Sequence, residues 1–86
     1  PDKVILPKDP KERKEYLARF ARMMSSKDHE ARRFAAKLLG RGDDLEFVPQ
    51  LIYGLSDPDP VVPRNAEASL RLISRQLDTS HIPKVG

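Results

Sequence analysis

The sharpest local signal in the chain is the turn at residues 56–60, which reads SDPDP. Pro60 suits the first position of a helix, because a proline there loses no hydrogen bond and its fixed φ matches helical backbone. Asp59 can cap the unpaired amides of that helix, and Pro58 disfavours continuing the preceding helix through Asp57. The turn and its flanks therefore predict an αα-hairpin.

The same hairpin is found twice when the chain is aligned with itself at an offset of about 31 residues, which is typical of a helical repeat array. Four kinds of feature match: small residues, bases, acids and apolar positions. The matching pairs are Ala35/Ala66, Leu39/Leu70, Arg33/Arg64, Asp28/Asp59, Ser25/Ser56, Tyr16/Phe47, Leu17/Val48, Phe20/Leu51, Ala21/Ile52, Met24/Leu55 and Ala31/Val62.

The predicted organisation has four parts: an extended lead-in at 1–8, a first repeat at 9–40, a second repeat at 41–77 and a tail or linker at 78–86. Helix starts are indicated by acid caps: Asp9 before Pro10, Asp28, the pair Asp43 and Asp44, and Asp59 before Pro60. The segment Gly40-Arg41-Gly42 predicts the end of the second helix, since glycine readily adopts the left-handed conformation there.

Apolar residues at helical spacing predict one buried face on each helix. The expected faces are Tyr16, Leu17, Phe20, Ala21 and Met24; then Ala31, Phe34, Ala35, Leu38 and Leu39; then Phe47, Val48, Leu51, Ile52 and Leu55; and finally Val61, Val62, Ala66, Leu70, Ile73 and Leu77. The fold class expected is all-α, with two antiparallel hairpins (four helices) stacked with a right-handed turn into a short α-solenoid segment.

Composition narrows the function classes. At 86 residues with 34% charged side chains, the chain is one small domain, without an apolar run of the roughly 20 residues that span a membrane or a secretory signal pattern. The absence of cysteine excludes disulfides, thiolate zinc sites and cysteine nucleophiles. The chain begins with Pro1, so we expect a fragment of a larger protein. The compartment stays open, with the cytoplasm favoured.

The segments LSDPDPVV and MSSKDHEARRFAAKLLG resemble the HEAT repeat in its short bacterial, phycobilisome-lyase-like form. The resemblance covers residues 9–77 and implies a superhelical scaffold that binds proteins. In that family an Asp in the turn and an Arg six residues later tie neighbouring repeats together. Here one repeat keeps Asp57 but has Pro63 in the Arg position, while the other keeps Arg32 but has Ser26 in the Asp position. We therefore expect Arg32 to contact Asp57 across the repeats.

The resemblance implies a non-catalytic protein–protein interaction or scaffold module, with second helices lining a concave binding face. A ladder of bases lies on those helices: Arg33, Lys37, Arg41, Arg64, Arg71 and Arg75. Guanidinium groups in a row suit phosphates or acidic side chains, so binding of nucleic acid or another polyanion is the alternative function. Neighbouring Glu30 and Glu67, and the absence of interleaved aromatic residues, weigh against that alternative.

The sequence offers no catalytic, cofactor or metal site. His29-Glu30 is similar to one His-Glu pair of the HEAT-like iron hydroxylases, but the equivalent positions in the second repeat are Pro60-Val61, which cannot ligate a metal. Asp43 and Asp44 are better explained as helix-start residues, and Ser25 and Ser26 have no triad-like histidine. Chromophore-lyase chemistry, which the subfamily name suggests, therefore has no residues to carry it.

The two halves of the chain differ in charge. Residues 1–42 contain twelve bases and six acids, and residues 43–86 contain four bases and seven acids. This asymmetry could steer an anionic partner to one end or favour head-to-tail contact with another copy. Two repeats leave their outer faces uncovered, so self-association through exposed repeat ends is expected unless Val4-Ile5-Leu6 and Ile82-Pro83 cover them.

Overall fold

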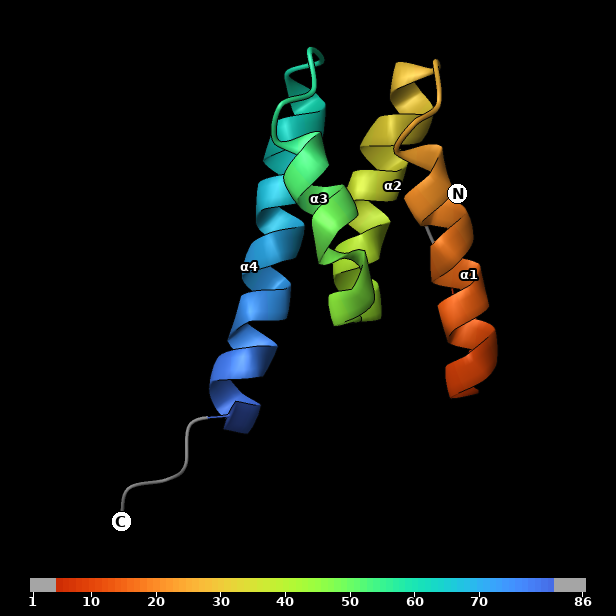
Figure 1. Ribbon diagram of the computed structural model, residues 1–86, viewed down its shortest axis with the longest axis vertical. Coiled ribbons are helices and arrows are strands. Elements are labelled where there is room, and N and C mark those ends of the chain that lie inside the picture. The colour runs from red at the N-terminus through yellow and green to blue at the C-terminus, as the bar shows by residue number, and fades with distance from the viewer. Residues whose placement is uncertain (1–4, 82–86) are drawn as a thin grey trace.

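The computed structural model describes the backbone of residues 5–81 and the side chains of residues 5–76. The described chain is all-α: its elements are α1 (Pro10–Met23), α2 (His29–Gly42), the short 3-10 helix η1 (Leu45–Phe47), α3 (Val48–Gly54) and α4 (Val61–His81). Helices α1 and α2 form one antiparallel hairpin, and η1, α3 and α4 form the other (Figure 1). Both hairpin turns lie at the same end of the molecule, with α1 and α4 on opposite sides. The predicted fold class, two antiparallel helical hairpins, is confirmed.

Acidic side chains begin each hairpin helix, as the sequence predicted, because each carboxylate accepts a hydrogen bond from an amide that has no partner within the helix. Helix α4 begins one residue after the predicted Pro60, and Asp44 caps η1, which leads directly into α3. The donor–acceptor pairs, with their N···O distances, are Glu12–Asp9 (3.0 Å), Glu30–Asp28 (3.0 Å), Glu46–Asp44 (2.9 Å) and Val61–Asp59 (2.8 Å).

Helix α2 ends within the predicted segment, at Gly42, but the prediction that a glycine takes the left-handed conformation there is wrong. The helix continues through Gly42, and the left-handed residue after it is Asp43, at φ 55°. The glycines serve a different purpose, which is close packing. A Cβ on Gly40 would lie 2.6 Å from Cα of Ser69, and a Cβ on Gly42 would collide with the side chain of Leu17. Because glycine has only a hydrogen atom as its side chain, α4 can approach α2 at Gly40 and α1 can approach α2 at Gly42.

Helix α4 is longer than the sequence indicated. It continues through His81, so the first four residues of the predicted tail at 78–86 extend this helix, and the remainder lies outside the described residues.

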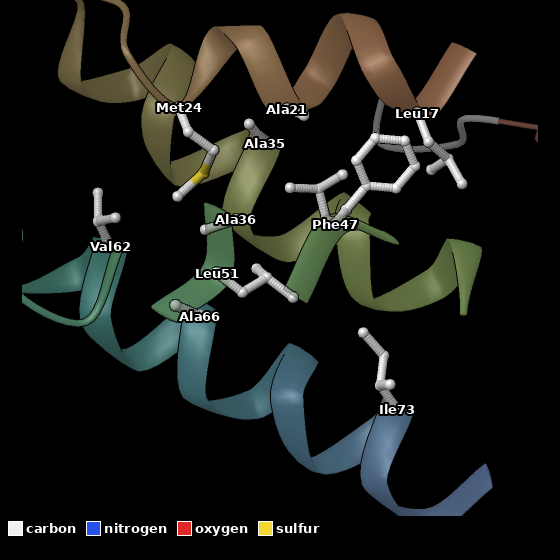
Figure 2. Close-up of a cluster of buried hydrophobic side chains, with 11 residues drawn as sticks. Leu17, Ala21, Met24, Ala35, Ala36, Phe47, Leu51, Val62, Ala66 and Ile73 are labelled. Carbon is white, nitrogen blue, oxygen red and sulfur yellow. The ribbon is translucent and has the colours of Figure 1, made fainter. Parts of the chain in front are cut away.

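One hydrophobic core joins the two hairpins (Figure 2). Every α-helix contributes to it, and the side chain of Met24 points from the end of α1 toward Val62 at the start of α4. The buried members are Leu17, Ala21, Met24, Ala35, Ala36, Leu39, Phe47, Leu51, Val62, Ala66 and Ile73. Because this one cluster of described residues spans both hairpins, the two repeats are expected to fold as one cooperative unit.

The most extensive helix contact joins α2 to α4. The buried hydroxyl of Ser69 donates to the backbone carbonyl of Ala36, and the side-chain amide of Asn65 donates to the carbonyl of Arg33 at 3.0 Å. Both polar groups are therefore satisfied within an interface that is otherwise formed by small and apolar residues. These contacts set the register of α4 along α2.

The predicted buried faces are only partly correct. Phe47 and Leu51 are buried, but Ile52 and Leu55 are 54% and 42% exposed, and Phe34 is 38% exposed. Helix α3 has apolar residues on two sides, and within the described chain only one side packs against the other helices. Of the lead-in, Leu6 packs against the core and Ile5 is exposed. Val4, Leu77 and Ile82-Pro83 lie outside the residues whose side chains are described.

Candidate binding surfaces and the hairpin junction

The predicted contact between Arg32 and Asp57 is confirmed, and it fastens the first hairpin to the turn of the second. The guanidinium donates through Nε to Asp57 Oδ2 at 2.8 Å and through Nη2 to Oδ1 at 3.2 Å. Its Nη1 donates to the backbone carbonyls of Ser26 at 2.8 Å and Lys27 at 3.2 Å. One arginine therefore holds both hairpin turns, with the planar fork geometry that lysine lacks.

A second ion pair lies beside the first and was not predicted. Arg33 donates through Nε and Nη2 to the carboxylate of Asp59 at 2.9–3.2 Å. The same carboxylate accepts the amide of Val61, so Asp59 caps α4 and fastens it to α2. The sequence contained one signal for this pair: Arg33 directly follows Arg32, and Asp59 is separated from Asp57 only by Pro58.

Both carboxylates stay ionised at neutral pH. Hydrogen bonds from Arg33 lower the pKa of Asp59 to about 2, against an opposing contribution from burial. For Asp57, burial acts to raise the pKa, but the hydrogen bonds from Arg32 and from the backbone amide of Asp59 outweigh it and lower the pKa. The junction between the hairpins therefore keeps full charges on both partners.

These ion pairs reduce the number of bases in the predicted ladder that are available to a partner. Arg33 is occupied by Asp59 inside the molecule, and Arg71 lies 3.5 Å from Glu67 on the surface of α4. Arg75 is exposed and also has an interaction partner. Lys37 and Arg41 on α2, and Arg64 on α4, are exposed and form no ion pair within the described residues. The structure thus leaves three of the six predicted bases fully available on two neighbouring helices.

The exposed apolar side of α3 is a second candidate surface, which we call the α3 patch: Val48, Ile52 and Leu55. Spacing of three and four residues places these side chains on one side of the helix. Ile52 and Leu55 are about half exposed, and Val48 is partly buried against the core. Their counterparts 31 residues earlier, Leu17, Ala21 and Met24, are buried where the second hairpin packs against α1.

A groove of about 240 Å³ separates α1 from α3. Ala21, Met24 and Ser25 line one wall, and Pro49, Gln50 and Tyr53 line the other. The Oε1 atom of Gln50 is buried and accepts no hydrogen bond from the described protein atoms. Helix α3 and its C-cap therefore carry three exposed large hydrophobic side chains, Ile52, Tyr53 and Leu55, next to this groove.

The remaining charged residues discussed from the sequence, His29 and the pair Asp43 and Asp44, lie at or near the surface. His29 is exposed in the first turn of α2. Lys14 of α1 pairs with Glu46 at 2.9 Å and lies 3.9 Å from Asp44, and these contacts raise its pKa. Among the residues that the structure describes, no three His, Cys, Asp or Glu side chains are grouped so as to hold a metal ion. Nor does any described helix combine the length and apolarity needed to cross a membrane.

Comparison of the chain with protein-family models, with curated proteins and with solved structures gives no match in any of the three.

Proposed function

We propose that this protein is a non-catalytic interaction module, a short HEAT-like array that binds a helical protein partner through its last hairpin. The tandem hairpins, their shared core and the Arg32–Asp57 pair support a repeat architecture. Two adjacent ion pairs hold the hairpins at their turn ends, which presents the outer surfaces on a rigid frame.

The observation that carries the proposal is the repeat relation of the α3 patch. Leu17, Ala21 and Met24 are buried in the core that the first hairpin shares with the second, and Met24 lies against Gly54 of α3. The α3 patch carries the equivalent positions of the second hairpin, and two of its members, Ile52 and Leu55, are exposed at 54% and 42%. In the first hairpin the equivalent residues are part of a core shared with a helical hairpin. The exposed apolar surface of the α3 patch therefore suits a helical partner.

Site-specific photo-crosslinking in the full-length protein tests this proposal. A photoreactive residue replaces Ser56, which is exposed beside the α3 patch, and in a second protein it replaces Arg22 on the far side of α1. We expect a discrete protein adduct from position 56 that Ile52→Glu abolishes, with no such adduct from position 22. Identical adducts from both positions, or an adduct that Ile52→Glu leaves unchanged, would contradict the proposal.

Polyanion binding is the second candidate function, favoured by the three exposed bases Lys37, Arg41 and Arg64. It predicts an affinity for DNA or RNA that falls steeply as salt rises, because phosphate contacts release counterions. Lys37→Glu with Arg41→Glu should then weaken binding strongly, whereas Lys27→Glu at the hairpin turn should weaken it less. Binding that is absent at low salt, or equally sensitive to both changes, would exclude this surface as a nucleic-acid site.

A further inference from the structure

The residues equivalent to the Arg33–Asp59 ion pair are not joined to each other, and they lie on different hairpins. Moving each partner by 31 residues leads from Arg33 to Arg64 on α4, and from Asp59 back to Asp28 at the start of α2. Both are exposed, and neither forms an ion pair within the described residues. The internal junction thus has one base and one acid in contact, while the equivalent base and acid face outward on opposite hairpins.

Asp28 is prepared for the role that Asp59 has. Each carboxylate caps a helix, Asp28 by accepting the amide of Glu30 and Asp59 by accepting the amide of Val61. Capping holds the carboxylate in place at the turn, and Asp59 shows that a carboxylate held in this way can accept an arginine from a neighbouring hairpin as well. Arg64 lies in the first turn of α4, at the same end of the molecule as the hairpin turns.

Apolar groups accompany the two charges. On the first hairpin an aromatic cluster of Tyr16, Phe20 and Phe34 is partly exposed, with edge-to-face ring centroids 5.1 and 5.5 Å apart. Its equivalents in the second hairpin are Phe47, Leu51 and Asn65, which pack toward the first hairpin. The aromatic cluster therefore occupies the position of an incoming face, and the α3 patch occupies the position of a receiving face.

We propose that a second copy of this chain docks head to tail on the last hairpin, with Arg64 of one copy pairing with Asp28 of the next. The α3 patch of one copy then covers the aromatic cluster of the other. This inference rests on the proposed function and names its partner. The charge of the halves favours the arrangement, since a basic first half meets an acidic second half.

The junction between copies differs from the internal one in ways that make it weaker. Arg71 stands where Gly40 lets the helices approach, and Phe34 stands where Asn65 bonds to α2. Pro63 and Ser26 occupy the positions of Arg32 and Asp57, so the second ion pair has no twin. Because a head-to-tail contact does not close on itself, the average mass should rise continuously with concentration.

Sedimentation velocity over a concentration series, at low and high salt, tests the proposal with the full chain. We expect the wild-type mass to rise with concentration and this rise to shrink in high salt. The Arg64→Glu variant should stay monomeric. The Asp28→Asn variant should associate more weakly than wild type, and asparagine keeps the helix cap, so α2 is preserved. Arg19→Glu on the outer side of α1 makes the same charge change away from the junction and should associate like wild type.

Mixing two variants gives the decisive result. Arg64→Glu and Asp28→Lys each place like charges at the junction when alone, but in an equimolar mixture every contact between one variant and the other joins opposite charges. Recovery of wild-type association in the mixture, with helical circular dichroism retained in each variant, supports the proposal. A wild-type monomer at every concentration, equal loss with Arg19→Glu, or no recovery on mixing would overturn it. A monomer that still gives the crosslinked partner at position 56 would leave the proposed function standing.

Discussion

The two hairpins have matching sequences but different surroundings. Ala21 and Met24 of the first hairpin are 8% and 1% exposed, while their counterparts Ile52 and Leu55 are 54% and 42% exposed. The more apolar pair is thus the more exposed one. At these two positions the side chain is buried in the first hairpin and exposed in the second, so their burial depends on the neighbouring hairpin as well as on the side chain.

The same contrast holds for the close helix contact. Gly40 lets α4 approach α2, whereas its counterpart Arg71 extends into solvent beside Glu67. Ser69 bonds to a backbone carbonyl of α2, whereas its counterpart Leu38 has no such role. The inner faces of α2 and α4 are thus specialised for one close junction.

The largest expected effect comes from truncating the buried member of an equivalent pair. Met24→Ala removes a fully buried side chain and should lower the free energy of unfolding by about 2–5 kcal/mol. Leu55→Ala at the equivalent exposed position should cost about 1 kcal/mol or less. Urea unfolding monitored by circular dichroism measures both, and equal losses would contradict the difference between the hairpins.

A smaller effect should follow from adding a methyl group at the glycine contact. Gly40→Ala improves helix propensity but places a Cβ against the backbone of Ser69, so a net loss of roughly 1–2 kcal/mol is expected. Arg71→Ala, at the equivalent position, should leave stability nearly unchanged. Thermal unfolding of the two variants provides the comparison, and a stabilised Gly40→Ala protein would show that the helices can separate without cost.

Removing an arginine should destabilise the chain only at the inner junction. Arg32→Ala leaves the partly buried Asp57 without its partner and releases two backbone carbonyls, so the melting temperature should fall clearly. Arg64→Ala removes a base that forms no ion pair within the described chain and should leave the melting temperature of the monomer unchanged. Differential scanning calorimetry of dilute samples separates these outcomes, and an unchanged Arg32→Ala protein would remove the pair's structural role.

The smallest effect is the acid dependence of the junction. The pKa of Asp59 is about 2 in the folded chain, against an ordinary value of 3.8. The unfolded chain therefore binds a proton first as pH falls, and the stabilisation present above pH 4 is lost between pH 4 and pH 2. Urea unfolding at a series of pH values should show this loss, and Asp59→Asn should show a shallower one. A variant curve parallel to wild type would assign the acid sensitivity to other carboxylates.

Sequence patterns predicted the features that depend on nearest neighbours. The caps Asp9 and Asp28 were correctly placed, because capping involves residues two or three positions apart. Arg32 and Asp57 were paired through a family pattern, although 25 residues separate them. Arg33 and Asp59 were missed, because nothing local distinguishes an arginine that faces a neighbouring hairpin from one that faces solvent. For the same reason Arg33 was expected on a binding face.

The sequence by itself determined that this chain makes four helices in two similar hairpins, since periodicity, proline and acid caps act over a few residues. Only the tertiary structure decided which faces are covered, why Gly40 and Gly42 are glycines, and that Asp43 takes the left-handed position. These outcomes depend on contacts between segments far apart in the chain. Equivalent residues such as Met24 and Leu55 differ in burial because Met24 lies in the core between the two hairpins, whereas no described residues cover the side of α3 on which Leu55 lies.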